Sequence, residues 1–210
     1  MPTIEQARAW YAVSDQVHDF DHILRVYRLA EVLAEKEGAD LEIVRAAALL
    51  HDAEDASGDD EVRLTHHEAA ASFAGKILAD EGWAEERIQA VQECILSHRF
   101  RTGAAPETLE AKVLFDADKL DAIGAIGVAR ALAYAVLDGQ PLYTPPSQTF
   151  IDTLKTEPGE AYTAYHEHLF KLSRIKERMQ TQTGRQMAEE RHQFMQAFFA
   201  QLIAEVEGRK

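Results

Sequence analysis

Apolar residues recur at helical spacing along almost all of this 210-residue chain, and this periodicity constrains the fold more than any other feature. The apolar stripe is clearest in one run of residues: Ile23, Val26, Tyr27, Ala30, Leu33 and Ala34. Alternation of apolar and polar residues, which is typical of a half-buried strand, is nearly absent. The sequence therefore predicts an all-α protein.

Cap and turn residues divide this pattern into separate helices. Gly38 is a natural stop for one helix, and Asp40 is the expected N-cap of the next, which runs through the very apolar LEIVRAAALL to His51 and Asp52. The remaining predicted helices cover about residues 4–13, 21–38, 66–81, 85–96, 107–115, 119–136, 161–182 and 184–207, the last two separated by the turn TQTG.

One segment interrupts this helical pattern, the Pro-rich GQPLYTPPSQT that begins at Gly139. It could mark a domain boundary, but the helices after it are too few and too regular for a separate role. With 46% hydrophobic residues, the chain can bury one full core. We therefore predict a single domain over residues 1–210, with a core at about 15–136 and a C-terminal helical extension at about 150–208.

Charge and composition exclude several classes of protein. A formal net charge of -14 argues against broad, non-specific binding to nucleic acid. No apolar run approaches the roughly 20 residues that cross a bilayer, so no membrane partner is expected. The single cysteine, Cys94, cannot form an internal disulfide, and MPTIEQARAW does not resemble a secretory signal. The sequence predicts a cytoplasmic location.

The pair His51-Asp52 at the end of an apolar helix is the first feature that composition does not explain. A buried, unpaired carboxylate would cost roughly several kcal/mol, so Asp52 needs hydrogen bonds or a cation. Neighbouring side chains point about 100° apart on a helix, so both reach one metal ion only at a helix terminus. The alternative interpretation is a solvated pair at an ordinary helix end.

Two further residues strengthen the metal interpretation. His22 lies near the start of the preceding helix, and Asp118 lies in the acidic run FDADKLD. Two imidazoles and two carboxylates suit manganese, iron, cobalt or nickel, tolerate magnesium or zinc, and leave room for water and substrate. Asp118 could instead cap a helix that starts at Lys119, and the two roles can coexist.

In this order, His22, His51-Asp52 and Asp118 resemble the HD superfamily of metal-dependent phosphohydrolases. The matching segments cover most of the chain: DHILRVYRLAEVLAEKEGAD, AAALLHDAED, HHEAAASFAGKIL, ILSHRF, EAKVLFDADKLDAIGAIGVARA and KLSRIKERMQTQTGRQMAEERHQFM. They are most similar to single-domain bacterial and archaeal HD hydrolases, in the branch that includes a nucleotide pyrophosphohydrolase.

This resemblance implies an HD-domain helical core with additional C-terminal helices. It implies a divalent metal, manganese first, held by His22, His51, Asp52 and Asp118, with Asp118 rather than Asp116 at the family position before Lys-Leu-Asp-Ala. The implied reaction is hydrolysis of a phosphoester or phosphoanhydride, and we expect the substrate to be a small nucleotide.

The acidic residues after the His51-Asp52 pair supply the candidate catalytic base. Asp55 stands where related hydrolases place a carboxylate that orients the attacking water, and Glu54 is the alternative because helix ends shift by a residue or two. The competing interpretation for both is an exposed acidic loop.

Basic and imidazole groups are expected near the phosphate, because charge develops on its oxygens. Arg25 shares a helix face with His22, and Lys119 follows Asp118, although Lys119 could equally be a solvated surface residue. Arg99 and Arg101 are weaker candidates.

Further histidines raise the question of a second metal. We predict one metal, with His67 and His98 lining the phosphate pocket, while a second metal held by His66, His67 and His98 is the alternative. We interpret four other histidines as ordinary surface residues: His18, His166, His168 and His192.

The leading hypothesis is thus a nucleotide phosphohydrolase. A non-catalytic sensor that binds metal and nucleotide is the alternative, and a di-iron HD oxygenase ranks last. The aromatic tail residues Phe194, Phe198 and Phe199 are expected to pack against the core or a second subunit, so a homodimer is plausible.

Overall fold

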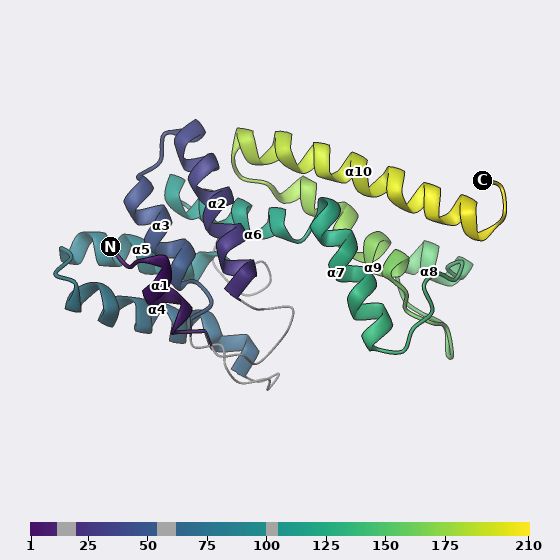
Figure 1. Ribbon diagram of the computed structural model, residues 1–210, viewed down its shortest axis with the longest axis horizontal. Helices are drawn as coiled ribbons and strands as arrows, with labels where there is room; N and C mark the ends of the chain where they lie inside the picture. The colour runs from purple at the N-terminus through teal and green to yellow at the C-terminus, as the bar shows by residue number, and fades with distance from the viewer. Residues whose placement is uncertain (12–19, 54–61, 100–104) are drawn as a thin grey trace. The chain divides into compact units, whose positions relative to one another are not determined.

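The computed structural model describes residues 1–11, 20–53, 62–99 and 105–210, with the backbone alone at residues 62–66 (Figure 1). These ranges are helical and contain no strand, so the predicted all-α class is confirmed. The chain groups into two compact units. Unit 1 comprises Met1–Asp118 and Gln180–Gly184, and unit 2 comprises Lys119–Met179 and Arg185–Lys210.

Unit 1 is built around one central helix. Its elements are α1 (Ile4–Arg8), α2 (Phe20–Glu37), α3 (Leu41–Leu50), α4 (Val62–Asp80), α5 (Glu85–Ser97) and most of α6 (Leu109–Asp121). The apolar α3 contacts α1, α2, α4 and α5, and α4 lies beside α5 (Figure 1). A buried cluster joins the first three helices through Ala7, Phe20, Ile23 and Leu49.

The start of α3 is fastened to two other helices. Asp40 is its N-cap, as predicted, and accepts hydrogen bonds from the backbone N–H groups of Glu42 at 2.9 Å and Ile43 at 3.2 Å. The same carboxylate pairs with Arg87 of α5 at 3.0 Å, and the Asp40 N–H donates to Glu110 of α6 at 2.9 Å. This cluster fixes the end of α3 that lies opposite His51.

The helix α6 corrects one prediction. It runs without interruption from Leu109 to Asp121, so the predicted helix end at residue 115 is wrong, and Asp118 lies inside a helix rather than at an N-cap. The break comes later, before α7 (Gly124–Leu137). There the backbone approaches closely, because a Cβ at Gly127 would lie 2.3 Å from the carbonyl oxygen of Ala122.

Unit 2 contains α7, α8 (Gln148–Thr153), α9 (Ala164–Phe170), the 3-10 helix η1 (Leu172–Arg178) and most of α10 (Gln182–Val206). The helix α9 contacts both α7 and η1. The prediction of one helix over residues 161–182 is wrong, because Lys171 ends α9 and the chain continues in the tighter 3-10 turn.

Hydrogen bonds to Glu160 close the Pro-rich loop of unit 2. The Glu160 carboxylate accepts from the backbone N–H and hydroxyl of Ser147 at 2.7 and 2.9 Å, and from the Glu157 N–H at 2.7 Å. The hydrogen bond from the Ser147 backbone is the main reason why the pKa of Glu160 falls to about 2. His166 lies with its Nε2 3.2 Å from the same carboxylate.

The interpretation of three tail histidines as surface residues is wrong. His166, His168 and His192 are all buried inside unit 2, and only His18 lies outside the described residues. No single helix in the described ranges is long and apolar enough to cross a membrane, although the bent pair α6 and α7 meets that test by length and composition.

Candidate metal site

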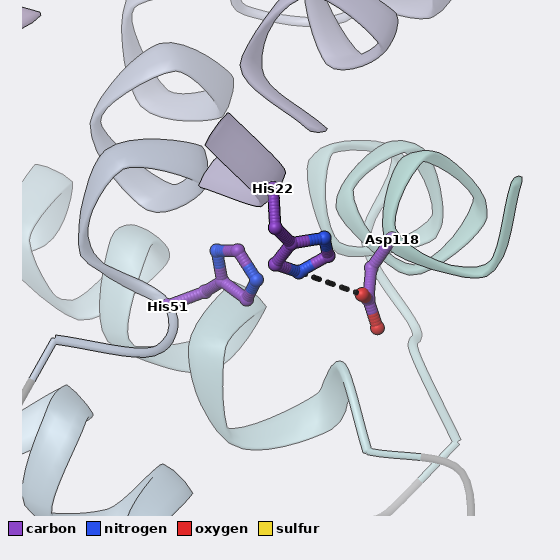
Figure 2. Close-up of side chains that lie close together, drawn as sticks. All are labelled: His22, His51 and Asp118. Atoms are coloured by element: carbon purple, nitrogen blue, oxygen red, sulfur yellow. Dashed lines mark ion pairs between the residues drawn. The ribbon is translucent and has the colours of Figure 1, made fainter. Parts of the chain in front are cut away.

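Three helices of unit 1 bring the predicted metal ligands together. His22 lies in the first turn of α2, His51 is the C-cap of α3 with Asp52 directly after it, and Asp118 lies in α6. Figure 2 shows the two imidazole rings and the Asp118 carboxylate turned toward a common space. One donor atom from each of His22, His51 and Asp118 falls within 4.8 Å of the others.

The distances between these atoms suit a shared metal ion better than direct hydrogen bonds. The Nε2 atom of His22 lies 3.5 Å from Asp118 Oδ1 and 3.8 Å from Asp52 Oδ2, and the Nε2 atom of His51 lies 3.4 Å from Asp52 Oδ2. Ligand bonds of about 2.1 Å at angles near 90–110° would separate two donor atoms by roughly 3.0–3.4 Å. Most of these separations are therefore close to those of a common coordination sphere.

His51 tests whether this set fits a metal. Its Nδ1–H donates to the carbonyl of Ala48 at 2.9 Å, and its buried Nε2 has no hydrogen-bond partner among the residues that the structure describes. Burial lowers the pKa of His51, which favours the neutral ring. The Nε2 lone pair is then free, and an orphaned buried nitrogen of this kind fits a metal ligand.

His98 repeats the arrangement of His51 at the end of another helix. It is the C-cap of α5, and its Nδ1–H donates to the carbonyl of Ile95. Its Nε2 lies 3.5 Å from Asp52 Oδ1, and its ring centroid lies 5.3 Å from that of His51. Asp52 therefore directs one oxygen toward His22 and His51, and its other oxygen toward His98.

For the other candidate residues, the structure gives the position in the fold and, for some, the burial of the side chain. Arg25 lies on α2, half-buried and one turn after His22, and the buried His67 lies on α4. Lys119 directly follows Asp118 in α6, and Arg99 is half-buried after His98. Glu54, Asp55, Arg101 and the side chain of His66 lie outside the described residues.

Sequence reasoning missed Tyr11. Its hydroxyl donates to the carbonyl of Leu49 at 2.8 Å, and its ring lies 5.6 Å from that of Phe20. Burial raises the pKa of Tyr11 well above its usual value, so the hydroxyl stays protonated as a donor. Tyr11 thus ties the last turn of α3, which presents His51, to the first turn of α2, which presents His22. The only signal in the sequence was an aromatic residue at helical spacing.

Comparison with known proteins agrees with this geometry. The family model described as HD domain matches residues 19–123. The Bacillus subtilis protein YpgQ is 37% identical over 208 residues, which cover 97% of this chain and 94% of YpgQ.

Solved structures show the same similarity. The crystal structure of YpgQ in complex with ADP matches with a TM-score of 0.74 at 36% identity, covering 99% of this chain and 100% of that one. A Bacillus thuringiensis HD-superfamily hydrolase matches with a TM-score of 0.72 at 29% identity, covering 97% and 96%. With its family match, its relatives and its convergent His and Asp side chains, this chain belongs to the HD-domain family.

Proposed function

We propose that this protein is a metal-dependent phosphohydrolase that acts on a small nucleotide. The observation that carries the proposal is the convergence of His22, His51 and Asp118 on one space, together with the orphaned Nε2 of His51. Membership of the HD-domain family and the resemblance to HD-superfamily hydrolases support hydrolysis. The ADP complex of YpgQ supports a nucleotide as the substrate.

His22, His51, Asp52 and Asp118 would hold the metal. This mixed set of nitrogen and oxygen donors suits manganese, with magnesium, cobalt, nickel, iron or zinc as alternatives. When bound, the ion neutralises charge on a phosphoryl oxygen and acidifies a water molecule. The residues of the chain fix the ligand directions: the hydrogen bond to Ala48 sets the ring plane of His51, and Tyr11 holds the helix end behind it.

Asp55 is our candidate for the group that positions the attacking water and accepts its proton, with Glu54 as the alternative. Both residues follow the ligand pair His51-Asp52 by a few positions. A carboxylate there would orient the attacking water and accept its proton.

Arg25, Lys119, His67 and His98 are our candidates for binding the phosphate groups. Arg25 stands one helical turn from His22 on α2, so its guanidinium can reach the same side of the helix. His98 directs Nε2 at Asp52, which brings a potential donor to the edge of the ligand set.

We propose that one metal ion binds. A second ion held by His66, His67 and His98 is the alternative, and the division of the Asp52 oxygens between His51 and His98 is the feature that would allow it. The two arrangements differ in stoichiometry, so metal titration separates them.

The test is turnover of a panel of nucleoside mono-, di- and triphosphates by the purified protein with manganese, magnesium, cobalt or nickel. Phosphate and pyrophosphate are followed separately, because their ratio shows which bond is broken. Asp52→Ala should abolish metal-dependent release, whereas the matched variant Asp80→Ala, which removes an exposed carboxylate on α4, should leave it intact.

The same experiment addresses the alternatives. No turnover of any nucleotide, with metal and nucleotide both still bound, would favour the sensor. Oxygen uptake by the iron-loaded protein, with no phosphate released, would favour the di-iron oxygenase. If Asp55→Ala binds metal and nucleotide normally but no longer hydrolyses, the sensor interpretation fails.

A further inference from the structure

Two buried histidines of unit 2 each have a ring nitrogen without a hydrogen-bond partner among the residues that the structure describes. They are His168 on α9, which is 5% exposed, and His192 on α10, which is 7% exposed, and the atom is Nδ1 in both. The buried His166 differs, because Thr163 Oγ1 lies 2.8 Å from its Nδ1 and Glu160 lies 3.2 Å from its Nε2. Since buried polar atoms are normally paired, the two Nδ1 atoms require an explanation.

The imidazole rings of His168 and His192 lie at a separation that suits an ion between them. Their centroids are 6.4 Å apart, and their planes differ by 27°. A metal–nitrogen bond of about 2.0 Å lets the centroids of two imidazoles on one ion lie up to roughly 6.3 Å apart. Because the nitrogen lone pair lies in the plane of its ring, nearly parallel rings can direct both lone pairs at the same ion. The observed separation is thus close to that of a nearly linear pair of ligands.

A buried thioether lies on the same face of α10. Met195 follows His192 by three residues, a spacing that puts two side chains on one side of a helix, and it is fully buried. Phe199 follows Met195 by four residues and continues this face. The ring of His168 contacts both His192 and Phe199, and its centroid lies 4.7 Å from that of Phe199. Met195 therefore lies in the stretch of α10 that His168 covers.

These donors favour a soft ion of low charge. Thioether ligands select monovalent copper, and imidazole also binds copper well. Within the described part of the chain, no histidine, cysteine or carboxylate joins the two rings in a set of three with donor atoms all within 4.8 Å of one another. A buried divalent ion without a carboxylate or thiolate would keep its charge uncompensated, which is costly. A monovalent ion avoids most of that cost.

Both imidazoles are neutral near pH 7, as metal ligands must be. Burial lowers the pKa of His168 to about 4, and burial and then Lys176 lower the pKa of His192. Glu189 and Glu177 act in the opposite direction on His192, and Glu189 pairs with Lys176 at 2.9 Å. The charges that face the pair are therefore of both signs, so they do not repel a single positive charge.

We propose that His168, His192 and Met195 form a binding site for monovalent copper. The two Nδ1 atoms are the main ligands, and the Met195 sulfur is a weaker third one. The ion gives both unpaired nitrogens a partner, and it stabilises unit 2 because it binds the folded chain. The inference goes beyond the proposed hydrolase function and does not depend on it, because none of these residues belongs to the candidate metal site of unit 1.

The first test is titration of the full chain with copper(I) under anaerobic, reducing conditions, with bicinchoninate as the competing chelator. The parent protein is the variant His51→Ala, which lacks a ligand of the candidate metal site in unit 1. It should bind one equivalent of copper. Cys94 does not compete, because it is buried and burial raises the pKa of its thiol. A parent protein that binds no copper would overturn the proposal.

Substitutions of the three donors separate this site from any other. In the same parent, His168→Phe and His192→Phe should each lose the bound copper, whereas Met195→Leu should keep it with an affinity lower by roughly tenfold. Met187→Leu, a matched change on α10 outside this stretch, should bind copper as the parent does. Circular dichroism checks that each variant is folded. Copper binding that survives both histidine substitutions would contradict the assignment.

Two measurements on the parent protein identify the ligands without substituting them. X-ray absorption of the copper-loaded protein should show two nitrogen neighbours and one sulfur neighbour. Silver(I), which has the same charge and is not oxidised by air, should shift the Nδ1 resonances of two histidines and raise the melting temperature. Silver-induced shifts at Nε2 instead, or zinc that displaces copper from these residues, would overturn the proposal. A copper spectrum without sulfur would remove Met195 from the site.

Discussion

Asp116 and Asp118 lie two residues apart on α6, yet their carboxylates have different partners. Asp116 is fully buried and accepts hydrogen bonds from the backbone N–H groups of Gln180 and Thr181, both at 2.8 Å, and from the Thr181 hydroxyl at 2.7 Å. The Oδ1 atom of Asp118 instead lies 3.5 Å from His22 Nε2. One aspartate holds the turn before α10, and the other is a candidate metal ligand.

Replacement of Asp116 should reduce stability and spare metal binding. Asp116→Ala leaves the buried donors of Thr181 without an acceptor, so we expect a loss of about 2–4 kcal/mol in the free energy of unfolding. Urea unfolding measures this loss, and manganese titration of the still-folded variant measures affinity. Asp118→Ala is the matched control, and we expect it to lose manganese while unfolding almost normally without metal. A reversal of these two outcomes would exchange the roles of the aspartates.

Gly184 should be intolerant of a side chain for a reason that involves Asp116. A Cβ at this position would lie 2.2 Å from Asp116 Oδ2, so Gly184→Ala forces the carboxylate away from its donors. We expect the variant to be destabilised by at least about 2 kcal/mol. In the Asp116→Ala background the part of that cost due to the carboxylate should disappear, while the 2.8 Å approach to Thr181 Oγ1 remains, and a double-mutant cycle measures the coupling. Additive effects would show that the clash lies elsewhere.

The two C-cap histidines should differ in their effect on metal content. With one bound ion, His51→Ala should lose manganese, whereas His98→Ala should keep one equivalent and lose turnover. Equilibrium dialysis combined with electron paramagnetic resonance counts the bound ions. A wild-type protein that binds two equivalents, one of which His98→Ala loses, would support the binuclear alternative.

Acid should weaken unit 2 through His168. This residue is buried against Phe199, with ring centroids 4.7 Å apart, and beside His192, and burial lowers its pKa from 6.5 to about 4. Because the unfolded chain takes up this proton first, the contribution of His168 to stability is complete above pH 6.5 and is lost as the pH falls toward 4. We expect a loss of about 1–2 kcal/mol between pH 6.5 and 5.

The variant His168→Phe isolates this effect. Nδ1 of His168 has no hydrogen-bond partner in the described residues, so a phenyl ring can take its place beside Phe199 and Tyr165. The variant should show a smaller fall in melting temperature between pH 7 and 5 than the wild type. Equal pH profiles would show that His168 is protonated as easily in the folded chain as in the unfolded one.

Local signals in the sequence were enough to predict the framework of the candidate site. Asp40 starts α3 because its carboxylate accepts hydrogen bonds from the first backbone N–H groups of that helix. Gly38 ends α2 because glycine adopts the positive φ that a helix end favours. Both effects act within a single helical turn. The same reasoning put His51 and Asp52 at a helix end, where both can face one point.

Features that depend on contacts distant in sequence could not be predicted. The acidic run around Asp116 resembles a helix boundary, yet α6 continues through it because Gln180 and Thr181 supply donors from far along the chain. The tail histidines are polar and lie at ordinary helical positions. His168 is buried against Phe199, which lies far along the chain on α10, and no local pattern reveals that contact.

The cluster formed by Asp40, Arg87 and Glu110 fixes the N-terminal ends of α3 and α5. The lengths of these two helices therefore determine where His51 and His98 lie. Eleven residues separate Asp40 from His51, and eleven also separate Arg87 from His98. The helices α3 and α5 therefore span the same length, about 16 Å, from the Asp40–Arg87 ion pair to the imidazole at the other end. Removing one residue from α3 or α5 would move the imidazole at its end by about 1.5 Å along the helix axis and rotate it by about 100°. We therefore expect substitutions that keep the buried side chains of α3 and α5 apolar to preserve the site, and a single insertion or deletion in either helix to disrupt it.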